Sequence, residues 1–357
     1  MSKRIGYIDI ARGIGILLVV LGHNDFGAVA PFARQVIYSF HMPLFFFLSG
    51  YFIDTSIGFW GFIIKRFNSI LKPYLFTIFM IYFAAISFEK MSFQTALGRI
   101  IKSLYASSYY IDWGQLWFLP HLFVVSLYAF FFHRLFAKLN SRFSKWVFLV
   151  ATLWLASFFL QSFYPFALTV FGKEYQLFGL PFSLDLLFLS GFFFILGGEI
   201  RQVTIEQTFE NPFLLLGTGV GVILLNFFFS QRIDFYARQY ESFLINTTQA
   251  IIGIVFIIAL SRQIDLRIQR LAPLFIYFGR ISMMILIFHV PIQDSWGQKI
   301  LAVTNNNLPL SIWVGFIMGV AGSILIYELF IKANPVASWW FGRQAELPEQ
   351  GAAPSNN

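Results

Sequence analysis

The main pattern along the chain is a series of long apolar runs separated by short polar segments. About 20 apolar residues in a helix cross the hydrocarbon core of a bilayer, which is about 30 Å thick. Such runs lie at residues 5–22, 36–53, 73–88, 116–134, 146–163, 183–199, 213–230, 243–260, 273–291 and 309–331. The pattern predicts an all-α integral membrane protein: a bundle of about ten transmembrane helices over residues 1–342 and a disordered cytoplasmic tail over 343–357.

The positions of lysine and arginine predict the orientation of this bundle. An even number of spans puts both termini on one side, and basic residues concentrate in cytoplasmic segments. With cytoplasmic termini, fifteen basic residues lie inside and eight outside. Three of the eight fall in segment 89–115, where Phe93, Leu97 and Ile101 recur at helical spacing beside Arg99 and Lys102. We therefore expect an amphipathic helix on the outer membrane interface there.

Composition excludes several classes of protein. Of 357 residues 58% are hydrophobic and only 12% charged, about half the charged fraction of soluble chains. This argues against a soluble enzyme, a nucleic-acid-binding domain and a disordered chain. There is no cysteine, which excludes disulfides, thiolate catalysis, iron–sulfur clusters and cysteine zinc sites. A cleaved signal peptide ending at Ala30 is a weaker interpretation, because Arg12 interrupts its apolar stretch and Pro31 would follow the cut.

Polar residues within the predicted spans sort by depth. Charged groups are costly in hydrocarbon and usually face a cavity or a partner. The predicted outer half holds His23, His41, His121, Asp185, Asn226, Asn246, Gln249 and His289, and the inner half holds Arg12, Lys65, Arg66, His133 and Arg280. The outer set suits proton transfer to or from a polyhydroxylated acceptor, and the inner set suits a phosphate-bearing ligand from the cytosol. The plainer alternative is that polar residues simply belong at helix ends.

Arg12 and His23 form the most specific pair. Eleven helical residues turn about 1100°, which leaves the two side chains about 20° from one face and about 16 Å apart along the axis. Asp9 precedes Arg12 by three residues and is close enough to pair with it. Snorkelling of Arg12 and a polar helix end at His23 remain the structural alternatives.

A zinc site built from the four outer histidines is a further alternative. Their spacing is not the local spacing of a zinc-binding helix, and no carboxylate has a fixed position beside them. We therefore expect no metal.

Five segments resemble blocks of a known family, the acyltransferase family 3 membrane proteins. The first is residues 8–13 followed by His23, with the arginine and histidine at the family's spacing. The others are residues 40–51, the basic segment 65–74, residues 116–120 (similar to fucose 4-O-acetylase-like members) and residues 285–291. The resemblance runs from about residue 5 to 331. One departure is Ser69, where many members have another arginine. We expect a stand-alone transferase, without the hydrolase-like domain that is fused to some members.

The resemblance implies O-acylation of an extracytoplasmic or lipid-linked glycan, such as an O-antigen or exopolysaccharide, with cytosolic acyl-CoA (by resemblance acetyl-CoA) as donor. Together with the depth pattern it leads to a hypothesis for the site. His23 acts catalytically with Arg12 and Asp9, either as a general base on the acceptor hydroxyl or as a transient carrier of the acyl group. Arg12, Lys65, Arg66 and Lys72 bind the donor. The acceptor-binding candidates are His41, Trp117, His121, Asn246, Gln249 and His289. The expected setting is multi-pass in the bacterial inner membrane, with membrane lipid and glycan as partners and no nucleic acid.

A glycan or lipid-linked glycan transporter is the rival function. It would also have many spans, a polar interior and intramembrane charge. A transporter has no need of an arginine and a histidine at this spacing, so the pattern favours the transferase.

Overall fold

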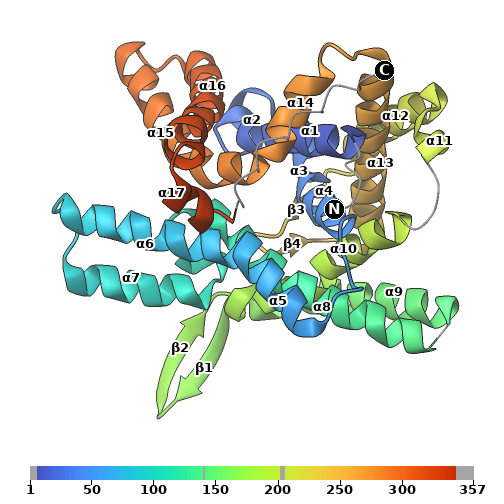
Figure 1. The fold of residues 1–357 in the computed structure, drawn as a ribbon, viewed down its shortest axis with the longest axis horizontal. Coiled ribbons are helices and arrows are strands. Elements are labelled where there is room, and N and C mark those ends of the chain that lie inside the picture. The colour runs from blue at the N-terminus through green and yellow to red at the C-terminus, as the bar shows by residue number, and fades with distance from the viewer. Residues whose placement is uncertain (1–5, 140, 202–205, 343–357) are drawn as a thin grey trace, which may run out of the picture.

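The computed structural model describes residues 6–139, 141–201 and 206–342, and most of these are helical (Figure 1). The predicted tail 343–357 lies outside the described residues. The α-helices are α1 (Gly6–Gly22), α2 (Phe26–Val29), α3 (Pro31–Tyr38), α4 (His41–Gly50), α5 (Phe59–Arg66), α6 (Lys72–Ser87), α7 (Phe93–Tyr105), α8 (Phe118–Leu139), α9 (Arg142–Phe159), α10 (Leu187–Arg201), α11 (Glu206–Phe209), α12 (Pro212–Phe228), α13 (Phe243–Arg267), α14 (Ala272–Arg280), α15 (Ser282–Val303), α16 (Leu308–Ile326) and α17 (Pro335–Trp340).

Shorter elements join these helices. The π-helical turns are η1 (Phe67–Leu71) and η6 (Tyr327–Lys332), and the 3₁₀ turns are η2 (Ser108–Tyr110), η3 (Gly114–Trp117), η4 (Leu160–Phe163) and η5 (Pro181–Leu186). Strands β1 (Phe166–Val170) and β2 (Lys173–Leu177) pair antiparallel, as do β3 (Ile233–Asp234) and β4 (Gln239–Tyr240). The β1–β2 hairpin projects from the body and was not predicted from the sequence (Figure 1).

Within the described residues, six helical segments are long and apolar enough to cross a membrane. They are Phe59–Ser87, Gly114–Leu139, Arg142–Phe163, Pro181–Arg201, Phe243–Arg267 and Leu308–Lys332. A seventh is the pair Ala272–Arg280 and Ser282–Val303, if a bend of 79° is counted within one span. The other three predicted spans overlap α1, α4 and α12, which have 17, 10 and 17 residues. Ten spans are therefore not confirmed, because an apolar run does not reveal where its helix breaks.

The basic segment after the second predicted span also differs from expectation. The gap between the predicted spans 36–53 and 73–88 implies a loop, but α5, η1 and α6 form one helical segment, Phe59–Ser87. Lys65 and Arg66 therefore stand on a helix, directly before the π-helical turn η1. π-Helical turns often accompany functional sites, because the wider turn redirects the side chains around it.

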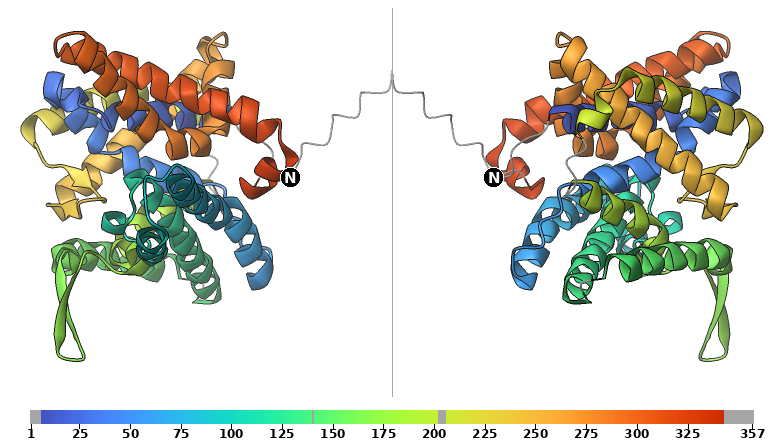
Figure 2. Two further views of the ribbon diagram at one scale, coloured as in Figure 1. Left: turned by 90° about the vertical axis from the view of Figure 1, so that its left-hand side faces the viewer. Right: turned by 90° about the vertical axis from the view of Figure 1, so that its right-hand side faces the viewer.

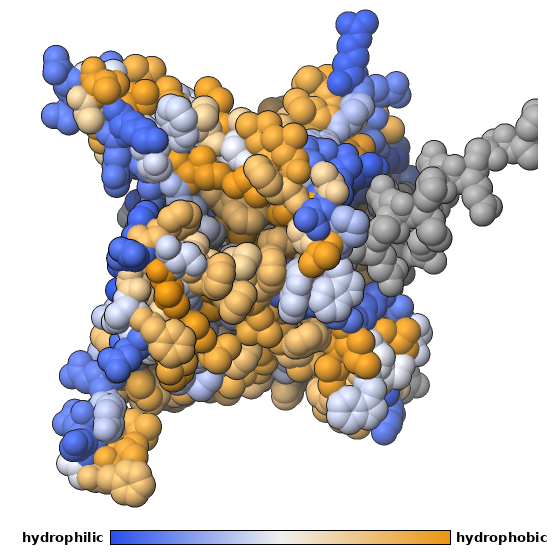
Figure 3. Space-filling model, turned by 60° about the vertical axis from the view of Figure 1, so that its left-hand side comes forward, coloured by the Kyte–Doolittle hydropathy of each residue, from blue (hydrophilic) through white to orange (hydrophobic). Residues whose placement is uncertain are grey.

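The amphipathic helix predicted within 89–115 is present as α7. Phe93, Leu97 and Ile101 are 69%, 48% and 61% exposed, so this apolar face has no protein covering it. Large exposed side chains occur elsewhere too, and one face of the molecule is broadly apolar (Figure 3). Soluble monomers rarely expose apolar surface on this scale, whereas lipid would cover it.

Most of the long helices form two groups that lie on opposite sides of the molecule. Helices α1, α14, α15 and α16 lie on one side, and α5, α6, α7, α8 and α9 on the other (Figures 1 and 2). Helix α4 packs against α1 on one side and against α10 on the other, and α10 contacts α8 and α9, so α4 links the two groups.

Two close crossings hold this arrangement, and both depend on glycine. A Cβ at Gly13 on α1 would overlap the carbonyl oxygen of Phe275 on α14, and one at Gly279 would overlap the carbonyl oxygen of Asp9. A Cβ at Gly50 on α4 would similarly meet the carbonyl oxygen of Phe194 on α10. Helices that approach so closely need small residues where they cross. The first crossing positions the helical turn that carries Arg12.

Substitution at this crossing is expected to destabilise the fold. Gly13→Val should lower the apparent unfolding temperature of the detergent-purified protein by about 2–10 °C, because overpacking costs about 1–3 kcal/mol. The control is Gly217→Val on α12, where a Cβ meets nothing within 4 Å. Tryptophan fluorescence during heating measures the apparent unfolding temperature of both variants. Equal unfolding temperatures would contradict the close crossing.

A buried ion pair organises the segments between the long helices. Arg238 is 0% exposed and donates from Nε to Asp185 Oδ2 at 2.7 Å and from Nη1 to Ser108 Oγ at 2.5 Å. It therefore joins the β3–β4 turn to η5 and to η2. The sequence pattern counts Arg238 among the eight outer basic residues between predicted spans, whereas the structure buries its side chain completely.

Candidate active site

One cavity of about 910 Å³ lies between the two groups of helices. It is lined from one group by α1, α14, α15 and η6, from the other by α5, η1, η3 and α8, and by α4, which links them. Arg12 and His23 both line it, although eleven residues separate them. The cavity is large enough for a drug-sized ligand or part of a larger one.

The Arg12 end of the cavity is rich in cations. Arg12 donates from Nη2 to the carbonyl oxygen of Leu48 at 3.1 Å, and its guanidinium lies 4.8 Å from the centre of the Phe52 ring. Asp9 Oδ1 is 3.9 Å from Arg12 Nη1, as the three-residue spacing suggested. These contacts hold the guanidinium beside the cavity. A planar guanidinium with donors to spare suits a phosphate group.

Further cations from three elements line the same end. They are Lys65 and Arg66 from α5, Arg280 from the end of α14, and Lys332 from η6. Arg66 lies over the Phe62 ring at 5.3 Å, and Lys332 pairs with Glu328 at 2.7 Å. Arg280 follows Gly279, whose close approach to the carbonyl oxygen of Asp9 brings this end of α14 beside α1.

A carboxylate outside the helices also borders this end. Asp54 accepts hydrogen bonds from the backbone N–H and the hydroxyl of Ser56, at 3.1 and 2.6 Å. These bonds lower the pKa of Asp54 below its usual value, so the group is ionised at neutral pH. The charge at this end is therefore mixed, with an excess of cations.

The His23 end carries the group suited to proton transfer. His23 is exposed and lines the cavity, and its Nδ1 lies 2.8 Å from the carbonyl oxygen of Val19. A carbonyl can only accept, so Nδ1 carries the proton in the neutral ring. Nε2 is then left with a free lone pair. An imidazole in this tautomer can act as a general base at Nε2.

Only some of the predicted acceptor-binding residues gather at this end. Trp117 lines the cavity, and the His289 ring packs edge-on against His23 with centroids 5.2 Å apart. His41 and His121 do not line it: His41 bonds the carbonyl oxygen of Ile37, and both His121 nitrogens are bonded, to Phe182 O and Ser190 Oγ.

The structure also places Asn246, Gln249 and Lys72 outside the cavity. Asn246 Oδ1 accepts from the Ser242 backbone N–H at the start of α13, and Gln249 Nε2 donates to the carbonyl oxygen of Phe229. Lys72 is 7% exposed and lies 3.9 Å from the centre of the Trp339 ring. These contacts give all three residues positions that stabilise helix packing.

Several residues that line the cavity were not predicted from the sequence. Gln115, Asp54, Tyr277, Glu328 and Lys332 all line it. Tyr277 donates to Glu328 at 2.9 Å, which links α14 to η6. The sequence analysis selected histidine and arginine residues within apolar runs. The five residues lie near the ends of helical segments, where polar side chains are common and do not indicate a site.

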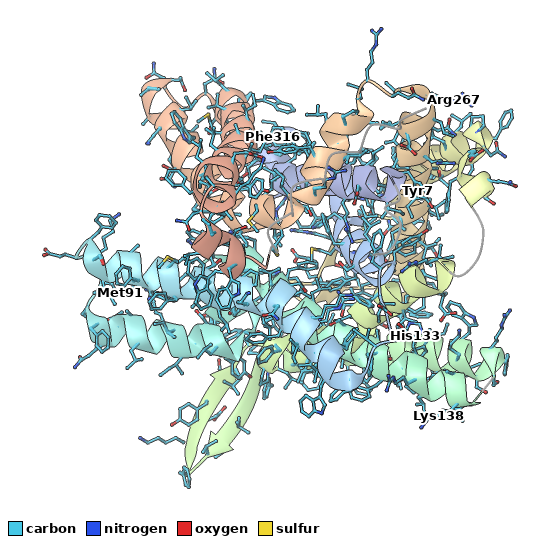
Figure 4. All side chains as sticks on the ribbon, in the orientation of Figure 1. Tyr7, Met91, His133, Lys138, Arg267 and Phe316 are labelled. Atoms are coloured by element: carbon cyan, nitrogen blue, oxygen red, sulfur yellow. The ribbon has the colours of Figure 1, made fainter. Side chains whose placement is uncertain are left out.

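His133 lies outside the cavity, and no metal-binding group of side chains is present among the described residues. His133 lies 3.5 Å from Glu199 and projects from α8 on the same helix as Lys138 (Figure 4). Within the part of the chain that the structure describes, no three histidine, aspartate or glutamate side chains are grouped so as to hold a metal. The expectation of no metal stays a prediction.

The apolar helices and this cavity define a multi-pass membrane protein with a polarised internal site. A family model described as an acyltransferase domain matches residues 5–328, and the chain belongs to acyltransferase family 3. The protein is therefore an acyltransferase of the membrane-embedded kind. No curated protein and no solved structure matches the chain.

Proposed function

We propose that the protein moves an acyl group, by resemblance acetyl, from cytosolic acyl-CoA to a hydroxyl of an extracytoplasmic or lipid-linked glycan. The observation that carries the proposal is that one cavity connects a cation-rich end at Arg12 with an imidazole base at His23. The first suits the phosphates of a nucleotide-bearing donor, and the second suits a hydroxyl nucleophile.

The proposed reaction follows from these two ends. Arg12, Lys65 and Arg66 hold the donor phosphates and leave the thioester directed toward His23. Nε2 of His23 takes the proton as the acceptor oxygen attacks the thioester carbonyl. The C–O bond forms, the C–S bond breaks, and the proton passes from Nε2 to the leaving thiolate. Asp9 acts by positioning Arg12.

The proposal includes an orientation and a location. Both termini lie in the cytoplasm, and the predicted spans that contain α1, α4 and α12 cross the membrane together with the longer helices. The cation-rich end then faces the cytosol, where acyl-CoA is found. The protein acts in the inner membrane, with the glycan presented from the other side or within the lipid.

Product analysis tests the proposal in the native host. The surface glycan is purified from the wild type and from a strain with the gene deleted, and its O-acyl content is measured by proton NMR. We expect the deletion strain to keep the polymer and lose one acyl signal. Disappearance of the polymer itself would contradict the proposal and favour the transporter.

A further inference from the structure

Gln115 has a position that no sequence pattern predicted. It stands in η3, is 5% exposed and lines the cavity. Its Nε2 donates to the carbonyl oxygen of Ile287 on α15 at 2.9 Å, and its Oε1 has no hydrogen-bond partner among the described residues. A buried amide oxygen without a donor is costly, and such an atom points to a ligand that supplies one.

Proline explains why Ile287 can hold this amide. In an α-helix the carbonyl of residue 287 would accept from the N–H of residue 291. Residue 291 is Pro291, inside α15, and proline has no N–H. The Ile287 carbonyl is therefore free, and Gln115 supplies the missing donor.

The hydrogen bond to Ile287 also sets the orientation of the Gln115 amide. A carbonyl can only accept, so the nitrogen of Gln115 must point at Ile287 and the oxygen must point away from it. His289 is fixed in a similar way, because its Nδ1 lies 2.7 Å from the carbonyl oxygen of Ile285. Its Nε2 is then an acceptor, buried and without a partner in the described part of the chain.

Two of these acceptor atoms, Gln115 Oε1 and His23 Nε2, belong to residues that line the cavity, and the third, His289 Nε2, belongs to a buried ring that packs against His23. Ile287 and His289 are two residues apart on α15, and the His289 ring contacts that of His23. A group of lone pairs disfavours phosphate or carboxylate and favours a ligand with several hydroxyl groups.

We propose that Gln115 is an acceptor-binding residue whose Oε1 receives a hydrogen bond from a hydroxyl next to the one that is acylated. The inference rests on the proposed function and deepens it. Gln115 would orient the acceptor relative to His23, and Pro291 would act through Gln115 as a positioning residue. The ligand class is a polyol with at least two hydroxyls within reach of both side chains.

The test is release of CoA thiol from acetyl-CoA by the detergent-purified protein, with and without methyl glycosides or glycerol. A thiol reagent follows the release directly, because the chain has no cysteine. We expect Gln115→Leu to change the response to the glycoside and to keep the wild-type KM for acetyl-CoA. Its half-saturating glycoside concentration should rise about tenfold, the loss expected for one hydrogen bond. Pro291→Ala should shift it in the same direction, because the restored N–H competes for the Ile287 carbonyl.

Gln263→Leu is the matched control. Gln263 is another buried glutamine whose Nε2 donates to a backbone carbonyl, that of Glu210 at 2.7 Å, but it does not line the cavity. The half-saturating glycoside concentration of Gln263→Leu should equal that of the wild type. The inference would be overturned if Gln115→Leu had the half-saturating glycoside concentration of the wild type. It would also be overturned if no polyol stimulated thiol release by the wild type. Absence of thiol release from the wild type even with polyol would instead contradict the proposed function.

Discussion

His23→Ala is expected to reduce acyl transfer by about 100- to 10,000-fold, the contribution usual for a positioned general base. The Nδ1 hydrogen bond to Val19 presents Nε2 as the base, and no other histidine lines the cavity in the described part of the chain. The loss should appear in kcat, because the ring acts on the proton in the transition state. O-acyl content in cells and thiol release from the purified variant both measure it.

The control for this variant is His133→Asn. His133 lies outside the cavity, and asparagine can keep its contact with Glu199. We expect near wild-type transfer. An unchanged rate in His23→Ala, with protein amount and unfolding temperature also unchanged, would remove His23 from the mechanism and leave the fold unaffected.

Arg12→Gln is expected to raise the KM for acetyl-CoA by about 10- to 100-fold. The guanidinium supplies charge-assisted hydrogen bonds, and each is worth about 1.5–3 kcal/mol. Asp9 would then lie beside the donor phosphates without its cation, which adds repulsion. Initial rates at varied acetyl-CoA concentrations separate this effect from a change in kcat.

Arg134→Gln is the matched control for Arg12. Arg134 also donates to a backbone carbonyl, that of Ile57 at 3.1 Å, and also lies over a phenylalanine ring, that of Phe130 at 4.4 Å. It does not line the cavity. The same rise in KM for both variants would mean that general charge, rather than the position of Arg12, attracts the donor.

Several features of the fold could be predicted from the sequence because they follow from local chemistry. Apolar runs too long for a soluble core require lipid, so the helical membrane class followed directly. The spacing of Arg12 and His23 on one helix follows from a constant 100° per residue, and the two do line one cavity. The amphipathic pattern around Phe93 also predicted a helix correctly, as α7.

Other features required contacts between distant segments. The break at Ser39 and Phe40 and the 79° bend before Ser282 are not visible as gaps in hydrophobicity, so the count of ten spans stays a prediction. The predicted depth in the membrane grouped Asn246 and Gln249 with His23. In the structure their side chains bond to backbone groups outside the cavity.

Hydropathy and helical periodicity thus determined the class of protein, the apolar segments and the shared face of Arg12 and His23. Only the tertiary structure decided which polar groups meet. It placed Arg280 in the wall of the same cavity as Arg12 through the crossing of α1 and α14, and it buried Arg238 against Asp185. It also joined Gln115 to a carbonyl that Pro291, 176 positions away, leaves free. The physical reason is that periodicity depends on neighbours within a few residues, whereas a hydrogen bond or a cavity depends on where whole helices cross.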